Sequence, residues 1–318
     1  MTASRPPTVG VDLGGTNIRA AAVDGDGQIL AEGRSSTPDH WPELRTAIAD
    51  LVDRLRDEEP TVAAVGVGAA GMVDRDGAIH YAPNIPRLIR VPLRDALAET
   101  LPVPVIVDND ANVAAWGEVC HGAARGVAYG LVITLGTGVG GGIISDGRIY
   151  RGAHGFGGEV GHWPFDPDGP DCACGERGHW EAAASGDALG ARARVLVAAG
   201  QAPALLARAG GDPDAVTGLA VGESAAAGES DGLGLLAEYA RQVALGFAGL
   251  ANILDPEVIV VSGGLVQLGD LLLDPLRDAF GSHLEGAPYR PPVPIVAAAL
   301  GDRAGVVGAA ALARDLVR

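Results

Sequence analysis

The chain contains the same strand–turn–strand pattern twice, and this repetition restricts the fold more than any other feature. The first copy has a glycine turn in Asp12-Leu-Gly-Gly-Thr-Asn17 and a tight turn in Asp24-Gly-Asp-Gly27. The second copy has Leu135-Gly-Thr-Gly-Val-Gly-Gly-Gly142 and then Ser145-Asp-Gly147. Apolar runs joined by Gly and Asp-Gly turns are typical of β-hairpins. We therefore expect two similar α/β domains, each opened by a hairpin and facing a cleft.

The remaining chain alternates between strand and helix patterns, as expected for α/β domains. Short apolar runs predict buried strands at residues 62–68, 103–107 and 258–261. Helical patterns cover residues 43–56, 181–254 and 304–317, and a loop-rich segment covers residues 151–178. We expect a small α/β domain of residues 1–113 plus 302–318, and a large α/β domain of residues 114–301 with a metal-binding loop.

Three glycine-rich turns follow predicted strands, at Gly14-Gly15-Thr16, Gly136-Thr137-Gly138 and Gly263-Gly264. Glycine lets the backbone approach a phosphate and direct its N–H groups toward it. A single such turn is common, but three at strand ends predict a nucleotide site. The second turn also fits G-x-G-x-x-G, which in dinucleotide-binding proteins is followed directly by a helix. A hairpin is predicted there instead, so a nicotinamide enzyme is the weaker alternative.

The charged residues exclude several classes of protein. The formal net charge is −17, and all 23 basic residues are Arg, because the sequence contains no Lys. A P-loop lysine, a protein-kinase lysine and a Schiff-base lysine are therefore excluded. An acidic surface repels nucleic acid. We expect neither a signal peptide at Met1–Thr8 nor a membrane span, and hence a cytoplasmic protein.

Polar residues are concentrated where the predicted strand at 103–107 ends, in Asp108-Asn109-Asp110-Ala-Asn112. Open α/β sheets bind ligands at the carboxyl ends of their strands. Asp and Asn are also favoured as helix N-caps, and a helix is predicted to follow. A cap uses one or two side chains, whereas four polar groups lie here within five positions. The pattern therefore predicts a functional site.

Two cysteines and two histidines lie close together in the loop-rich segment, at His162, Cys172, Cys174 and His179. This donor set suits a tetrahedral Zn²⁺ site. Because four protein ligands complete the coordination, the metal is expected to be structural and to fix the loop that carries Glu159 and Glu181. Cys120 lies apart from this group and is expected to be an ordinary buried thiol.

Together these motifs resemble the ROK family of repressors and sugar kinases, within the actin/hexokinase superfamily, over nearly the whole chain. The most specific part is the family signature G-H-x(6)-G-x-x-C-x-C-G-x-x-G-C-x-E. The matching positions here are Gly161-His162, Gly169, Cys172, Cys174-Gly175, Gly178, His179 and Glu181. The third cysteine is replaced by His179, so we expect a Cys2His2 site in place of Cys3His.

The resemblance implies a two-domain actin-like ATPase (ribonuclease H-like) fold and a role for each motif. Asp110 matches the family's catalytic base. The implied sugar contacts are Asn84, Asn109, Asp110, Glu159, His162 and Glu181, with His162 also on zinc. The implied ATP contacts are Gly14, Gly15, Thr16, Gly136, Thr137 and Gly138 for the phosphates, Gly263 and Gly264 for the adenosine, and Asp12 for Mg²⁺.

The resemblance thus implies ATP-dependent phosphorylation of the 6-hydroxyl of a free hexose, with glucose favoured and a homodimer expected. N-acetylmannosamine, N-acetylglucosamine, kanosamine and a cyclitol remain alternative substrates, and polyphosphate an alternative donor. A sugar-sensing regulator is the alternative from another class. Family repressors carry a DNA-binding segment before the first glycine turn, whereas only eleven residues precede Asp12.

Overall fold

The computed structural model describes residues 5–82, 85 and 88–317, which form two compact units. The first unit contains residues up to 128, 142–158 and from 299 onward, and the second contains residues 129–141 and 159–298. The division into a small domain (residues 1–113 plus 302–318) and a large domain (residues 114–301) stays a prediction from the sequence. In the described part of the chain, no helix is long and apolar enough to cross a membrane.

The first unit is built on a five-stranded sheet of order β3-β2-β1-β4-β7. Strands β1, β2 and β3 are antiparallel neighbours, whereas β1, β4 and β7 run parallel. The strands are β1 (Thr8–Leu13), β2 (Asn17–Val23), β3 (Ile29–Ser36), β4 (Val65–Ala69) and β7 (Val105–Asn109), with a small hairpin of β5 (Met72–Val73) and β6 (Ile79–Tyr81). The first predicted hairpin is confirmed.

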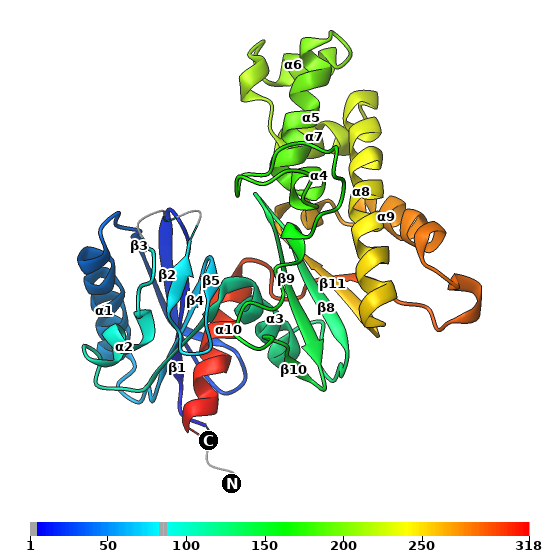
Figure 1. The fold of residues 1–318 in the computed structure, drawn as a ribbon. Helices are drawn as coiled ribbons and strands as arrows, with labels where there is room; N and C mark the ends of the chain where they lie inside the picture. The colour runs from blue at the N-terminus through cyan, green and yellow to red at the C-terminus, as the bar shows by residue number, and fades with distance from the viewer. Residues whose placement is uncertain (1–4, 83–84, 86–87, 318) are drawn as a thin grey trace. The chain divides into compact units, whose positions relative to one another are not determined.

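Helices cover both faces of this sheet. They are α1 (Trp41–Glu58), α2 (Leu93–Ala98), α3 (Asp110–His121) and α10 (Ala304–Ala313). Helix α1 buries one apolar stripe that includes Leu44, Ile48 and Leu55. Helix α10, at the red end of the chain in Figure 1, packs on β1 and α3. It approaches so closely that a Cβ at Gly10 would lie 1.8 Å from the Val306 carbonyl oxygen.

The second sheet repeats the order of the first, as β10-β9-β8-β11-β12. Its strands are β8 (Gly130–Leu135), β9 (Val139–Ser145), β10 (Arg148–Ile149), β11 (Val258–Ser262) and β12 (Ile295–Ala297). The boundary between the units passes through β9, so the end of β9 and β10 are counted with the first unit. The matching order confirms the repeat that the two hairpins predict.

The second unit also contains a set of helices, as the pattern over residues 181–254 predicts. They are α4 (Glu181–Ala184), α5 (Gly186–Ala198), α6 (Pro203–Arg208), α7 (Gly218–Ala226), α8 (Ser230–Leu254) and α9 (Asp270–His283). Helix α8 is the longest of them and buries Tyr239 and Phe247. Trp180 is fully buried and packs edge-on against Phe247, with the ring centroids 5.9 Å apart.

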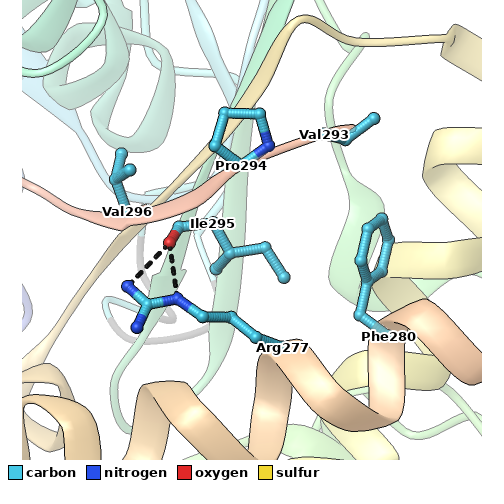
Figure 2. A pocket seen from close by; sticks show the side chains of 6 residues that line it. All are labelled: Arg277, Phe280, Val293, Pro294, Ile295 and Val296. Atoms are coloured by element: carbon cyan, nitrogen blue, oxygen red, sulfur yellow. Dashed lines mark hydrogen bonds between the residues drawn. The ribbon is translucent and has the colours of Figure 1, made fainter. Parts of the chain in front are cut away.

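Strand β12 lies at the edge of the second sheet, and α9 covers part of that edge. Arg277 of α9 donates hydrogen bonds from Nε and Nη2 to the Ile295 carbonyl, at 3.1 and 3.0 Å. Figure 2 shows this contact beside a shallow pocket that is lined mostly by apolar side chains such as Phe280 and Val293. None of the predicted site residues lines this pocket, so it has no part in the proposed chemistry.

Candidate functional site

The polar cluster of the first unit lies at the end of β7 and the start of α3. Strand β7 extends to Asn109, two residues beyond the predicted apolar run, and Asp110 is the first residue of α3. The Asn109 side chain accepts a hydrogen bond from the Asn112 N–H at 3.0 Å and caps the helix. Asn109 is therefore the cap of α3 and also one of the residues of the predicted site.

Asp110 is half-buried, and its Oδ1 accepts the Ala111 N–H at 2.8 Å. Desolvation is the main cause that raises the pKa of Asp110 to about 6; the Ala111 hydrogen bond opposes this shift and the nearby Asp12 carboxylate contributes to it. The helix N-terminus therefore does not lower this pKa below its ordinary value, because burial has the larger effect. The carboxylate still predominates at pH 7.

Two residues to which the sequence assigned no individual role complete this cluster. Asp108 precedes the cap residue in β7, and Arg151 follows β10. Arg151 Nε lies 2.7 Å from Asp108 Oδ2, and the Asp108 side chain is nearly buried. The sequence signal that could have identified Arg151 was the position of an Arg at the start of the loop-rich segment, in a chain that contains no Lys. Its acidic partner, 43 residues away, could not be identified from the pattern.

The first glycine turn lies in the same unit. The Gly14 N–H closes the turn on the Asn17 carbonyl at 3.1 Å, while Gly15 and Thr16 are exposed. Asp12, in β1, is paired with Arg19 of β2, whose Nη2 lies 2.7 Å from Asp12 Oδ2. The structure thus places a carboxylate and exposed backbone beside each other at the end of β1.

The second glycine turn lies in the second unit, where Glu181 contacts it. Glu181 Oε2 accepts the Val139 N–H at 2.9 Å. Its other oxygen, Oε1, lies 3.4 Å from the Cys172 sulfur. The same side chain therefore connects the Gly136–Gly138 turn with the Cys/His cluster.

The third turn and Glu159 lie in the second unit as well. Gly263 has φ = 107° and lies against the backbone of Leu135. Gly264 begins a 3-10 helix (Gly264–Leu268) that precedes α9. Glu159 is exposed, and its carbonyl accepts the His162 N–H at 3.1 Å. The remaining predicted sugar contact, Asn84, lies outside the described residues.

The four predicted metal ligands come together, with their donor atoms all within 4.8 Å of one another. Cys174 Sγ lies 3.2 Å from His179 Nδ1, and Cys172 Sγ lies 3.8 Å from His162 Nδ1. Tetrahedral bonds to one Zn²⁺ would separate sulfur and nitrogen by about 3.6 Å. The cluster therefore fits the ion, with His179 in the place of the family's third cysteine.

The donors also suit a metal chemically. Burial is the main cause that raises the pKa of the Cys172 thiol to about 12; the backbone hydrogen bond with Cys174 opposes this shift, and the Cys174 and Glu181 side chains contribute to it. Without a cation this thiol would stay protonated, whereas Zn²⁺ ionises a coordinating thiol.

The predicted residues are thus divided between the two units. In the first unit they are Asp12, Gly14, Gly15, Thr16, Asn109 and Asp110. In the second unit they are Gly136, Thr137, Gly138, Glu159, His162, Cys172, Cys174, His179, Glu181, Gly263 and Gly264.

Comparisons with known proteins agree with these observations. The sequence pattern of the ROK family matches residues 8–316. The chain is 42% identical to the glucokinase of Streptomyces coelicolor over 311 residues, which are 97% of this chain and 98% of that protein. It is 34% identical to the N-acetylmannosamine kinase of Citrobacter koseri over 313 residues, which are 96% and 98% of the two chains.

The structure is similar to that of a ROK family glucokinase from Streptomyces griseus in complex with glucose and AMPPNP. The TM-score is 0.87 at 42% identity, and the match covers 97% of this chain and 99% of that one. The protein therefore has the two-domain actin-like ATPase fold of these sugar kinases. The family match over nearly the full length, together with this similarity, shows that the chain belongs to the ROK family.

Proposed function

We propose that the protein transfers the γ-phosphoryl group of ATP to the 6-hydroxyl of a free hexose, with glucose as the preferred substrate. The observation that carries this proposal is Asp110, a carboxylate at the start of α3 whose pKa is raised to about 6. The curated relative with 42% identity is a glucokinase, and the similar solved structure contains glucose and AMPPNP.

Asp110 acts as the general base. Phosphoryl transfer has a loose transition state, so positioning and electrostatics supply most of the catalysis. The Asp110 carboxylate orients the sugar hydroxyl and accepts its proton as the new O–P bond forms. A base with a pKa of about 6 is ionised at neutral pH and is more basic than an ordinary aspartate.

Several polar side chains are assigned to the sugar hydroxyls in this proposal. Asn109 contributes its amide, and Glu159 and Glu181 contribute carboxylates. Nδ1 of His162 faces the Cys172 sulfur, so Nε2 is the ring nitrogen assigned to a sugar hydroxyl. Asn84 is the further sugar contact that the family resemblance implies.

The glycine turns bind ATP. Because the Gly14 N–H closes its own turn, the phosphate donors of the first turn are Gly15 and Thr16. Gly136, Thr137 and Gly138 contact the phosphates as well, and Gly263 and Gly264 contact the adenosine.

Two metal ions are assigned to this chain's own residues. Asp12 would position, through water, a Mg²⁺ ion whose charge would offset that of the phosphates. His162, Cys172, Cys174 and His179 hold a structural Zn²⁺, which fixes the loop between Glu159 and Glu181. A cytoplasmic homodimer, as the family resemblance implies, completes the proposal; light scattering on the purified protein tests the dimer.

ADP release by the purified protein with Mg-ATP tests the function across glucose, mannose, N-acetylmannosamine, N-acetylglucosamine and kanosamine. A large glucose-dependent rate supports the proposal. Activity on N-acetylmannosamine alone would favour the second candidate, for which the 34% identical kinase is the supporting observation. No activity on any sugar, with folded and zinc-loaded protein, would refute a hexose kinase.

A further inference from the structure

Arg151 and Asp108 form an ion pair next to the proposed base, and the proposed function gives neither of them a task. Arg151 Nε and Nη2 each lie 2.7 Å from Asp108 Oδ2. Only 7% of the Asp108 side chain is exposed, against 29% for Arg151. A carboxylate with so little contact with water needs a cation and hydrogen bonds to remain charged.

The two oxygens of Asp108 have different partners. Oδ2 accepts from Arg151, while Oδ1 accepts the Asn109 N–H at 2.8 Å and Asn112 Nδ2 at 3.3 Å. Asn109 in turn caps α3 by accepting the Asn112 N–H. The Asp108 carboxylate therefore orients both asparagines that shape the first turn of α3, where Asp110 lies.

The guanidinium is itself held in place. Arg151 Nη1 donates to the Ile149 carbonyl at 3.2 Å, and the Arg151 carbonyl accepts the Gly157 N–H at 3.0 Å. Arg75 Nε donates to the Gly152 carbonyl at 3.0 Å, next in the chain to Arg151. The loop that carries Arg151 is thus fixed to the segment that joins β5 and β6.

We propose that Asp108 and Arg151 are positioning residues for phosphoryl transfer. Arg151 fixes the orientation of Asp108, and Asp108 fixes Asn109 and the first turn of α3, so that Asp110 meets the sugar hydroxyl in the reactive orientation. This inference rests on the proposed function. Because a misplacement of about 1 Å can cost about 10²-fold in rate, the effect should appear mainly in kcat.

A double-mutant cycle tests this coupling. Asp108→Asn, Arg151→Gln and the double variant are compared with the wild type in kcat and in KM for sugar and ATP. Each single variant is expected to lower kcat about 10²-fold, with KM for ATP within about threefold of the wild type. Because Arg151 acts through Asp108, the double variant should lose about as much as either single variant.

Two further variants separate positioning from general damage. Arg151→Lys keeps a cation but loses the paired N–H donors, so it should recover part of kcat. Arg148→Gln, which changes an exposed Arg three residues earlier, should behave like the wild type. Wild-type kcat in Arg151→Gln would overturn the proposal, as would losses that multiply in the double variant.

Amide hydrogen exchange gives a readout that does not depend on activity. Arg151→Gln should speed exchange at Asn109 and Asn112, and Arg148→Gln should not. If the wild type phosphorylates no sugar, the proposed function fails, and the exchange rates still test the positioning role. Unchanged exchange in Arg151→Gln would overturn that role.

Discussion

A general base has to lose its own proton and still attract another one, and the surroundings of Asp110 meet both requirements. Desolvation and the Asp12 carboxylate favour the protonated form, while the Ala111 N–H favours the ionised form. The balance lies at a pKa of about 6, which is closer to neutral pH than the ordinary value of 3.8. Proton transfer is most efficient when the pKa of the base lies near the working pH.

The activity should therefore depend on pH through this carboxyl. As the pH falls through about 6, Asp110 gains a proton and can no longer accept one from the sugar. We expect kcat/KM to decrease tenfold per pH unit well below that value. Initial rates from pH 5 to 8, at saturating Mg-ATP, give the profile. A rate independent of pH over this range would contradict the assignment of Asp110 as base.

Replacing the carboxyl should affect activity and stability in opposite directions. Asp110→Asn is expected to lose on the order of 10²–10⁴ in kcat, the usual contribution of a general base. The pKa of Asp110 is higher in the folded protein than its ordinary value, so this group's contribution to stability is lost as the pH rises from about 3.8 through 6. At pH 7.5 the variant should be more stable than the wild type, by about 1–3 kcal/mol.

Thermal melting of both proteins at pH 7.5 and pH 4 checks this expectation. The difference in stability should shrink at the lower pH, where the wild-type carboxyl is protonated. A variant that loses activity and also melts lower at pH 7.5 would indicate a structural role for Asp110.

Among the elements, helix α8 supports the loop with the predicted zinc ligands. Trp163 and Trp180 directly follow the two histidines of the Cys/His cluster. Their rings lie over glycines of α8: a Cβ at Gly246 would lie 2.0 Å from the Trp180 ring, and one at Gly249 would lie 2.9 Å from Trp163. Residues three apart share one face of a helix, so both rings use the same side of α8.

Adding a methyl group at this contact should destabilise the protein. Gly246→Ala places a carbon 2.0 Å from the Trp180 ring, and we expect a loss of about 1–3 kcal/mol in stability from overpacking. Gly234→Ala is the matched control, because Gly234 is exposed in the same helix and its Cβ would meet nothing within 4 Å. The control should gain up to about 1 kcal/mol from helix propensity. Urea unfolding measures the stability of both variants. Equal changes in stability would contradict the close packing of Trp180 on Gly246.

Removing one predicted zinc ligand tests the Cys/His cluster. His179→Ala should bind less zinc and raise KM for the sugar, because the loop that carries Glu159 and Glu181 loses a fixed point. His283→Ala changes an exposed histidine at the end of α9 and should leave zinc and KM unchanged. Metal content is measured by elemental analysis after gel filtration. Full activity in metal-free wild-type protein would contradict the role of zinc.

At the scale of the whole molecule, local patterns predicted the elements but not their partners. Hairpins and glycine turns depend on neighbouring residues, so both copies of the repeat could be identified. The Cys/His cluster is also local, since its four ligands lie within eighteen positions of one another. The pairing of Asp108 with Arg151 and the packing of Trp180 on Gly246 depend on tertiary structure. No periodicity in the sequence encodes either contact.

The net charge of the molecule should also decide which phosphate donor it uses. The formal charge is −17 and every basic residue is Arg, so a long polyanion meets net repulsion. We expect Mg-ATP to give a rate on the order of 10-fold higher than long-chain polyphosphate at low ionic strength. Salt of about 0.1 M shortens the range of charge interactions to about 10 Å. It should therefore reduce the difference in rate between the two donors. Glucose 6-phosphate formation with each donor, at low and high salt, measures this. Faster turnover with polyphosphate at low salt would mean that a local group of arginines outweighs the net charge.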